Sequence, residues 1–433
     1  MKTLQARAVL LLALILLVTS CSGEGKTAAS TTEQTAPSTS TTSAAPTDST
    51  TSTSTTSSTS TTAPIPPLVV WVDDTLAAVL DGYAADFEAA TGIPVSIETH
   101  DIGGIVPQAI ESIEEGTGPD LFYGSHRWLG QLQSAGLISD VPIPDPQAYL
   151  PLALAAFTSQ GVLYGLPYTI ETPALYFNMA LIPEAPQGFS DLAAVCESLA
   201  ITVRCLGMPS DDPETHLAIV TAFGGYGFGP GEDGFDGTDI GLDSEGALFA
   251  ADFIDEQSLM GSLVPGDEAI RQFEEGKAAF LLARPMSNPG PTEWGAVPYQ
   301  PFGALESAIV AEVYGFMVSS ASTQPVAARV FLTEFVGTDE PMFDLFSVSF
   351  VGPARVSAYE DAVRTDPRIA AFTPSGTDPK VLLAPKPELD DLLAAFGNAL
   401  SLISSRQYTD ATPDARTAFS QVATALRLAE SEG

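Results

Sequence analysis

An unbroken run of five apolar residues, Leu68–Val72, constrains the fold of this chain more than any other feature of its sequence. A strand with one solvated face would alternate apolar and polar residues, so an unbroken run predicts a strand buried on both faces of a sheet. Helix N-cap residues follow at 73–75, and apolar residues then recur at helical spacing until Gly92. Val95–Glu98 predicts the next strand. The segment is therefore predicted to form a β-α-β unit with a right-handed crossover, which is typical of an α/β fold.

The same alternation continues along the chain. Strands are predicted at 120–123 and 278–283, and the apolar segment 163–168 leads into 175–178. Helices are predicted at 105–114, 125–136, 189–200, 216–222, 246–257, 269–275, 325–336, 342–346, 388–403 and 413–430. Ligands of open α/β sheets bind beyond the carboxyl ends of the strands. The first strand-to-helix turn has no glycine-rich phosphate fingerprint, so nucleotide binding is not supported.

The charge balance excludes two classes of function. The 433 residues provide room for two or three domains of about 150 residues each. They include 17 Lys and Arg against 54 Asp and Glu, a formal net charge of −37. Nucleic acids and anionic lipid surfaces attract proteins through Lys and Arg, so we expect no nucleic-acid partner and no charge-driven membrane binding. The three histidines His100, His126 and His216 also offer few catalytic imidazoles.

The first residues have the layout of a secretory signal peptide. Lys2 and Arg7 precede the apolar run Ala8–Val18, which is too short to span a bilayer because about 20 residues are needed. The sequence that ends at Cys21 resembles a bacterial lipobox. We therefore predict a signal peptide at 1–20 and lipidation of Cys21, which would hold the protein on a membrane outside the cytoplasm. An ordinary signal peptide with an incidental cysteine is the alternative.

A disordered tether is predicted at 21–67. Within it, 26 of the 36 residues Thr27–Thr62 are Ser or Thr, which cannot bury a core but offer hydroxyls for O-glycosylation. From residue 68 onward, 14 Lys and Arg face 51 Asp and Glu. This excess suits a salty extracellular medium, because salt screens the self-repulsion of the chain.

Motifs spread over nearly all of residues 68–433 resemble the extracellular solute-binding proteins of the maltose/maltodextrin-binding type. Their order and spacing carry the resemblance, and no single motif is diagnostic. They are Trp71, Phe87-Glu88, Thr91–Val95, Gly118–Asp120, Ser134–Leu137, Tyr164–Pro167, Glu171, Tyr176–Asn178, Phe273–Phe280 and Asp366–Ala371.

The resemblance implies a two-lobed, periplasmic-binding-protein-like α/β fold of type II, with a ligand cleft between the lobes. It places 68–169 and 314–359 in the N-terminal lobe, and 171–312 and 363–433 in the C-terminal lobe. Members of this family close their lobes around a solute and deliver it to the permease subunits of an ABC importer. The chain is therefore expected to be a monomeric transport protein, without catalytic groups and without a cofactor.

The solute that the resemblance implies is a carbohydrate of the maltose type or a related one. Sugar sites use aromatic rings for the pyranose face, and carboxylates, amides and arginines for the hydroxyls. Where the family sets its stacking aromatic residues, this chain has Gly124, Glu214, Met286 and Leu393. The Asp-Arg pair of the family falls on Arg127-Trp128. Glu171 matches the cleft glutamate of the family, and Asp212 replaces a second one.

Two other functions stay open. The same fold binds other solutes, such as a polyamine, iron or an organic acid, and the acidic composition suits a cation. A secreted glycosidase would use two carboxylates, but an acidic chain offers such pairs by chance. The sequence contains neither G-x-S-x-G nor H-E-x-x-H.

The first half of the chain offers two groups of candidate ligand contacts. The group in the first strand-to-helix turn consists of Asp73, Asp74 and Thr75. These side chains either bind ligand hydroxyls or only cap the helix. The group after the strand at 120–123 consists of Ser125, His126, Arg127 and Trp128. It joins an imidazole, a guanidinium and an aromatic ring, unless the indole faces the core and the guanidinium faces solvent.

The remaining candidate contacts lie farther along the chain, each near a predicted hinge, helix start or strand end. They are Tyr168, Glu171, Asp212, Glu214, Arg284, Met286, Tyr314 and Arg355. Helix capping is the alternative role for the two acidic residues before the helix at 216–222. Tyr314 and Arg355 face either the ligand or away from it.

Cys196 and Cys205 lie nine positions apart, across a helix end and the following strand. They are predicted to form a disulfide, since an oxidising compartment favours one and metal binding lacks histidine partners. Four aspartates between 233 and 243 predict a solvated hairpin, because their spacing is not that of an EF-hand loop.

Overall fold

The computed structural model describes residues 65–186, 189–200, 202–231, 234–287, 289–290, 293–298, 310–374 and 382–432. The predicted signal peptide, Cys21 and most of the predicted tether lie outside these residues, as does Asp233 of the predicted hairpin. Within the described part of the chain, no helix is long and apolar enough to cross a membrane.

The first sheet is mixed and has seven strands. They are β1 (Leu68–Val72), β2 (Val95–Thr99), β3 (Leu121–Ser125), β4 (Ile138–Ser139), β7 (Leu166–Glu171), β15 (Glu312–Ser319) and β16 (Gly352–Pro353). The order is β16-β7-β15-β3-β1-β2, and β4 pairs with β15. Strand β1 runs parallel to β2 and β3, which confirms the predicted β-α-β unit. Strand β15 runs antiparallel to both β3 and β7.

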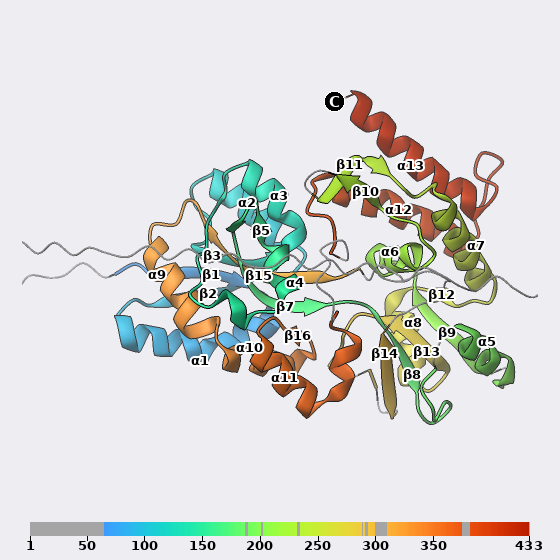
Figure 1. The fold of residues 1–433 in the computed structure, drawn as a ribbon, viewed down its shortest axis with the longest axis horizontal. Coiled ribbons are helices and arrows are strands. Elements are labelled where there is room, and N and C mark those ends of the chain that lie inside the picture. The colour runs from blue at the N-terminus through green and yellow to red at the C-terminus, as the bar shows by residue number, and fades with distance from the viewer. Residues whose placement is uncertain are drawn as a thin grey trace, which may run out of the picture. The chain divides into compact units, whose positions relative to one another are not determined.

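Helices cover both faces of this sheet, with α2 and α3 above it and α1 and α10 below it in Figure 1. The α-helices of this half are α1 (Asp74–Thr91), α2 (Ile105–Glu114), α3 (Leu129–Ser134), α4 (Pro151–Ala156), α9 (Pro325–Val330), α10 (Asp339–Ser349) and α11 (Val356–Thr365). Shorter turns are η1 (His126–Trp128), η2 (Pro146–Ala148) and the π-helical η3 (Phe331–Val336), and a small ribbon pairs β5 (Thr158–Ser159) with β6 (Val162–Leu163).

The second sheet has five strands in the order β12-β9-β13-β8-β14. They are β8 (Ala174–Asn178), β9 (Arg204–Pro209), β12 (Leu263–Val264), β13 (Ala278–Ala283) and β14 (Trp294–Pro298). Strands β12, β9 and β13 are parallel, and β8 runs antiparallel to β13 and β14. The helices are α5 (Phe189–Ser198), α6 (Pro213–Ala222), α7 (Glu245–Leu259), α8 (Gly266–Glu274), α12 (Glu388–Ser405) and α13 (Ala415–Glu432). The turn η4 (Pro367–Ala371) packs against β14 of this second sheet.

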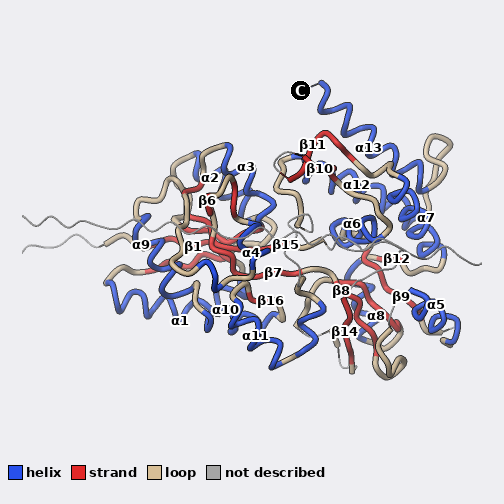
Figure 2. Tube along the Cα trace, in the orientation of Figure 1, coloured by secondary structure: helices blue, strands red, loops and turns tan. Residues whose placement is uncertain are grey.

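Each sheet has its own apolar core, and Figure 2 shows the strands as two groups among helices. The first core gathers residues such as Phe122, Phe157 and Phe316 around β1, β3 and β15. The second core joins the other sheet to α12 and α13 through residues such as Phe396 and Phe419. These two α/β lobes confirm the predicted fold class.

A third apolar cluster bears on the predicted lobe boundaries, which stay a prediction. It packs Phe346 and Phe350 of the α10 end against Tyr176 and Trp294 of the second sheet. Phe350 itself ends α10 in the left-handed region, at φ 62°. Two phenylalanines from the range expected for the N-terminal lobe therefore pack with residues of the other sheet.

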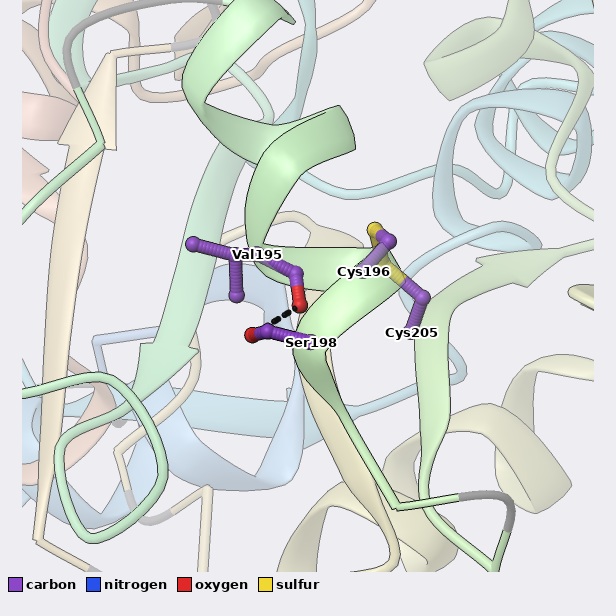
Figure 3. Close-up of a disulfide and its surroundings, with 4 residues drawn as sticks. All are labelled: Val195, Cys196, Ser198 and Cys205. Carbon is purple, nitrogen blue, oxygen red and sulfur yellow. Dashed lines mark hydrogen bonds between the residues drawn. A yellow bond between two sulfur atoms is a disulfide. The ribbon is translucent and has the colours of Figure 1, made fainter.

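The predicted disulfide between Cys196 and Cys205 is confirmed, with 5.2 Å between the two Cα atoms. Figure 3 shows it joining the end of α5 to β9. The predicted acidic hairpin is formed by β10 (Phe228–Gly231) and β11 (Gly234–Ile240). In the described part of this hairpin, Asp236 accepts hydrogen bonds from the backbone and hydroxyl of Thr238.

Candidate functional site

The carboxyl ends of the strands place polar residues of both lobes together. Strands β3 and β7 point the same way because both run antiparallel to β15, so Glu312 at the start of β15 lies at their carboxyl edge. In the second sheet, Asp212 and Arg284 follow the carboxyl ends of the parallel strands β9 and β13. This edge is where open α/β sheets bind ligands.

Arg284 is the central cation of this region. Its Nη1 donates to Glu171 Oε1 at 2.8 Å and to Glu312 Oε2 at 2.6 Å, and its Nη2 donates to Glu214. Its Nε lies 3.9 Å from a carboxylate oxygen of Asp212. Glu171 and Glu312 are direct partners in the antiparallel β7–β15 pair. Two like charges at such a position repel each other, so Arg284 offsets a repulsion that the strand register imposes.

Arg127 supplies a second cation, from the other lobe. Its Nη1 donates to Glu214 Oε1 at 2.5 Å, and its Nη2 lies 3.9 Å from Asp390. The guanidinium also lies over the Trp128 ring, 5.3 Å from the centroid. Glu214 therefore holds one arginine of each lobe, one on each carboxylate oxygen.

We call these six residues the carboxylate–arginine cluster: Arg127, Glu171, Asp212, Glu214, Arg284 and Glu312. With all six ionised, the cluster has two more carboxylates than guanidinium groups. Glu312 is 3 % exposed and Glu171 is 9 % exposed, so the charges lie largely out of water. Electrostatic interactions are stronger in such a setting than at a solvated surface.

The two paired glutamates differ in pKa. Burial raises the pKa of Glu171 above its ordinary value, and Arg284 compensates for this only in part. Burial also acts to raise the pKa of Glu312, but Arg284, Arg127 and a hydrogen bond from Ser125 outweigh it and lower this pKa to about 2. Glu312 therefore stays ionised, and Glu171 is the member of the pair that takes up a proton first.

Aromatic rings of the first sheet adjoin the cluster. Tyr314 stacks on Tyr123 with 5.8 Å between ring centroids, and the Tyr123 hydroxyl lies 3.0 Å from the Thr169 hydroxyl. Burial raises the pKa of Tyr123 well above its ordinary value, and the nearby carboxylates of Asp73, Glu171 and Glu312 raise it further. Tyr314 is half-buried, so it is the ring of this stack that can offer a surface to a ligand.

His126 does not belong to the cluster and instead contacts the backbone of two distant chain segments. It is fully buried. Its Nδ1 accepts from the Val313 amide at 3.2 Å, and its Nε2 lies 3.0 Å from the Leu383 carbonyl oxygen. The Nδ1 atom also lies 3.3 Å from the Val313 carbonyl oxygen, and burial lowers the pKa of His126. His126 thus joins η1 to β15 and to the chain segment that precedes α12.

The other predicted contacts occupy different surroundings. Asp73 caps α1 through the amides of Thr75 and Leu76, and Asp74 and Thr75 are exposed in the first turn. Tyr168 is fully buried beneath Phe316. The Met286 amide donates to the Tyr176 hydroxyl.

Arg355 also lies apart from the cluster. It pairs with Asp145 at 3.0 Å and Asp339 at 2.6 Å, and it lies over the Tyr149 ring. All of these partners belong to the elements around the first sheet.

Sequence reasoning missed Glu312 and Asp390 as parts of this site. A signal for Glu312 was present, since a single carboxylate precedes the apolar segment Val313–Val318. A buried carboxylate needs a partner, so such a residue at a strand start points to a nearby cation. Asp390 gave no such signal, because it lies in a helix start rich in acidic residues where N-terminal charge is ordinary.

Two lobes whose strand ends meet at a shared polar cluster define a two-lobed ligand-binding protein. The family model of the bacterial extracellular solute-binding proteins matches residues 82–371, and the chain belongs to this family. Family membership indicates a location outside the cytoplasm.

Several curated relatives are similar to this chain. The maltodextrin-binding protein MdxE of Bacillus subtilis is 25 % identical over 363 residues, which cover 78 % of this chain and 84 % of MdxE. A maltooligosaccharide ABC transporter solute-binding lipoprotein of Streptococcus pneumoniae is 27 % identical, over 50 % of this chain and 54 % of the relative. A galactooligosaccharide-binding protein of Bacillus subtilis is 26 % identical, over 51 % of this chain and 55 % of the relative. In the last two alignments the chain spans about half the length of the relative. All three relatives are named as binding proteins rather than enzymes.

Proposed function

We propose that this protein captures an oligosaccharide outside the cytoplasm and delivers it to the permease subunits of an ABC importer. The three relatives differ in the sugar that their names give, but each name gives an oligosaccharide. The observation that carries the proposal is the sharing of Glu214 between Arg127 of one lobe and Arg284 of the other. Strong hydrogen-bonding groups of both lobes converge there, as capture by lobe closure requires.

The chemistry of the cluster suits a polyhydroxylated ligand. Carboxylates such as Glu171 and Glu214 accept hydrogen bonds from sugar hydroxyls, and the two guanidiniums donate to hydroxyl and ring oxygens. The half-buried rings of Tyr314 and Trp128 are candidates for the apolar face of a pyranose. In this proposal the ligand contacts are Ser125, Arg127, Trp128, Glu171, Asp212, Glu214, Arg284, Glu312 and Tyr314.

The proposal includes a membrane anchor and a monomeric state. Lipidation of Cys21 and the Ser/Thr-rich tether would hold the lobes outside the membrane while the permease collects the solute. The pneumococcal relative is named a lipoprotein, which supports this arrangement. The transport role needs no catalytic group.

A cationic solute such as a polyamine is the second candidate. It is favoured by one observation, the excess of two carboxylates over guanidiniums in the cluster. A cation would neutralise part of this excess, whereas a neutral sugar would not.

The test is isothermal titration calorimetry of the whole chain with maltotriose, a galactooligosaccharide and spermidine. We expect an oligosaccharide to bind, and Glu214→Gln to weaken its binding about 10- to 100-fold because a charged hydrogen-bond partner is lost. Glu360→Gln is the matched control, since Glu360 is exposed on α11, away from the cluster. Binding of spermidine but of neither sugar would overturn the sugar assignment. Binding of an oligosaccharide that E214Q does not alter would show that the cluster is not the site.

A further inference from the structure

A cavity of about 520 Å³ lies beside the Cys196–Cys205 disulfide. It opens at the amino ends of β9 and β13, where the Arg204 amide donates to the Lys277 carbonyl at 2.8 Å. The carboxylate–arginine cluster follows the opposite ends of these same strands. The cavity is therefore a separate feature of the second lobe, and its volume falls within the range of about 300–1,000 Å³ that is usual for small-molecule sites.

The charge of the cavity wall is opposite to that of the chain. Three cationic side chains line it, Arg204, Arg271 and Lys277, against one carboxylate, Glu268. Across the whole chain, acidic residues outnumber Lys and Arg by 54 to 17. Cations are thus concentrated at this cavity, where a random distribution would place mainly carboxylates.

Arg204 has the least compensated charge of the three. Every other arginine in the described part of the chain has a carboxylate oxygen within 4.0 Å, whereas Arg204 has none among the described residues. The Nε and Nη1 atoms of Arg204 are also buried and have no hydrogen-bond partner among the described residues. A poorly compensated guanidinium costs stability, and an anion placed in the cavity would lower that cost.

The other two cations are held beside Arg204. Arg271 pairs with Glu268 and Glu275, and Lys277 pairs with Glu275 at 2.5 Å. The two cysteines of the disulfide also line the cavity, and their bond joins the end of α5 to the strand that carries Arg204 (Figure 3). The site is therefore built on a strand, a helix and a covalent link rather than on one surface loop.

We propose that this cavity binds a small organic phosphate, with Arg204 as its principal cation and Arg271 and Lys277 on its rim. A guanidinium with flanking cations suits the two negative charges of a phosphate group better than the single charge of a carboxylate. The cavity volume leaves room for the organic part of the molecule. This site is independent of the proposed oligosaccharide site.

The test is calorimetric titration of the whole chain with glycerol 3-phosphate, inorganic phosphate and citrate. We expect glycerol 3-phosphate to bind most tightly, and sodium chloride to weaken its binding. Arg204→Gln should weaken that binding at least about tenfold. Arg364→Gln makes the same charge change at an exposed helix position outside the cavity and should leave the binding unchanged.

Two further measurements separate a lost site from a lost fold. Arg204→Lys keeps the charge without the planar fork, so it should bind glycerol 3-phosphate with an affinity between those of the natural protein and R204Q. Each variant should also keep the circular dichroism spectrum of the natural protein, a test of folding that does not depend on the proposed function.

Three outcomes would overturn the proposal: no binding of either phosphate, tighter binding of citrate than of glycerol 3-phosphate, or equal binding by R204Q and the natural protein. Equal affinity for inorganic phosphate and glycerol 3-phosphate would overturn the assignment to an organic phosphate.

Discussion

Replacing Arg284 by glutamine tests whether this arginine stabilises the buried glutamate pair of β7 and β15. Arg284 donates to both Glu171 and Glu312, which are 9 % and 3 % exposed. Removing one partner from a buried ion pair costs about 3–5 kcal/mol, because the remaining charge is left uncompensated. The pKa of Glu312 points the same way: its decrease from 4.5 to about 2, to which Arg284 contributes more than Arg127 or Ser125, corresponds to about 3 kcal/mol at neutral pH. We therefore expect Arg284→Gln to lower the free energy of unfolding by about 3 kcal/mol at pH 7.

The sign of the pH dependence follows from the direction of the shift. Since the pKa of Glu312 is lower in the folded state, its stabilisation is complete above the unfolded value of 4.5 and is lost as the pH falls towards 2. By the same relation, about 1.5 kcal/mol remains at about pH 3. The loss of unfolding free energy that Arg284→Gln causes should therefore be about half as large at about pH 3 as at pH 7.

The assay is urea unfolding of the whole chain, followed by tryptophan fluorescence and by circular dichroism at both pH values. Arg364→Gln is the control, because the Arg364–Asp361 pair is exposed and such pairs contribute about 0–1 kcal/mol. A loss below about 1 kcal/mol for R284Q at neutral pH, or a loss that does not change with pH, would refute this account.

Two further predictions concern the buried histidines and the disulfide. Burial lowers the pKa of both His126 and His216, so the free energy of unfolding should fall as the pH drops below about 6.5, the ordinary histidine pKa. His126→Gln should make this decrease between pH 7 and pH 5 smaller, as urea titrations would measure. An unchanged decrease would contradict the prediction. The disulfide closes a loop of sequence separation nine, for which chain entropy predicts about 2–3 kcal/mol. Replacing Cys196 and Cys205 by serine should therefore speed amide exchange in α5 relative to α2, as hydrogen-exchange mass spectrometry would measure, and equal exchange in α5 with and without the disulfide would contradict it.

Local elements were predictable wherever one segment determines its own structure. The helix at 105–114 and the strand at 278–283 have the predicted bounds, because apolar spacing and the flanking turn residues mark both ends. Helix α6 starts three residues before the prediction, although Asp212 and Pro213 form an ordinary N-cap and first position. Helix α4 was missed because its six residues are almost all apolar and show no helical period.

Long-range pairing was less accessible from sequence. Strand β15 inserts between β3 and β7, which are separated from it by more than 100 positions, and no local signal encodes that neighbour choice. The disulfide was predictable because only two cysteines follow Cys21 in the sequence. Arg355 illustrates the opposite case: its turn was predictable, but its partners Asp145 and Asp339 come from distant segments.

The conflict between strand register and charge at the β7–β15 pair argues for a ligand-binding role of this edge. Pairing Glu171 with Glu312 opposes folding, because like charges face each other out of water. A pair of apolar residues would avoid the repulsion, and buried ion pairs seldom stabilise more than apolar packing does. Arg284 therefore offsets a cost that the fold does not require. Proteins keep such local conflicts where function needs the groups, and carboxylates and guanidiniums are groups suited to binding hydroxyls or cations.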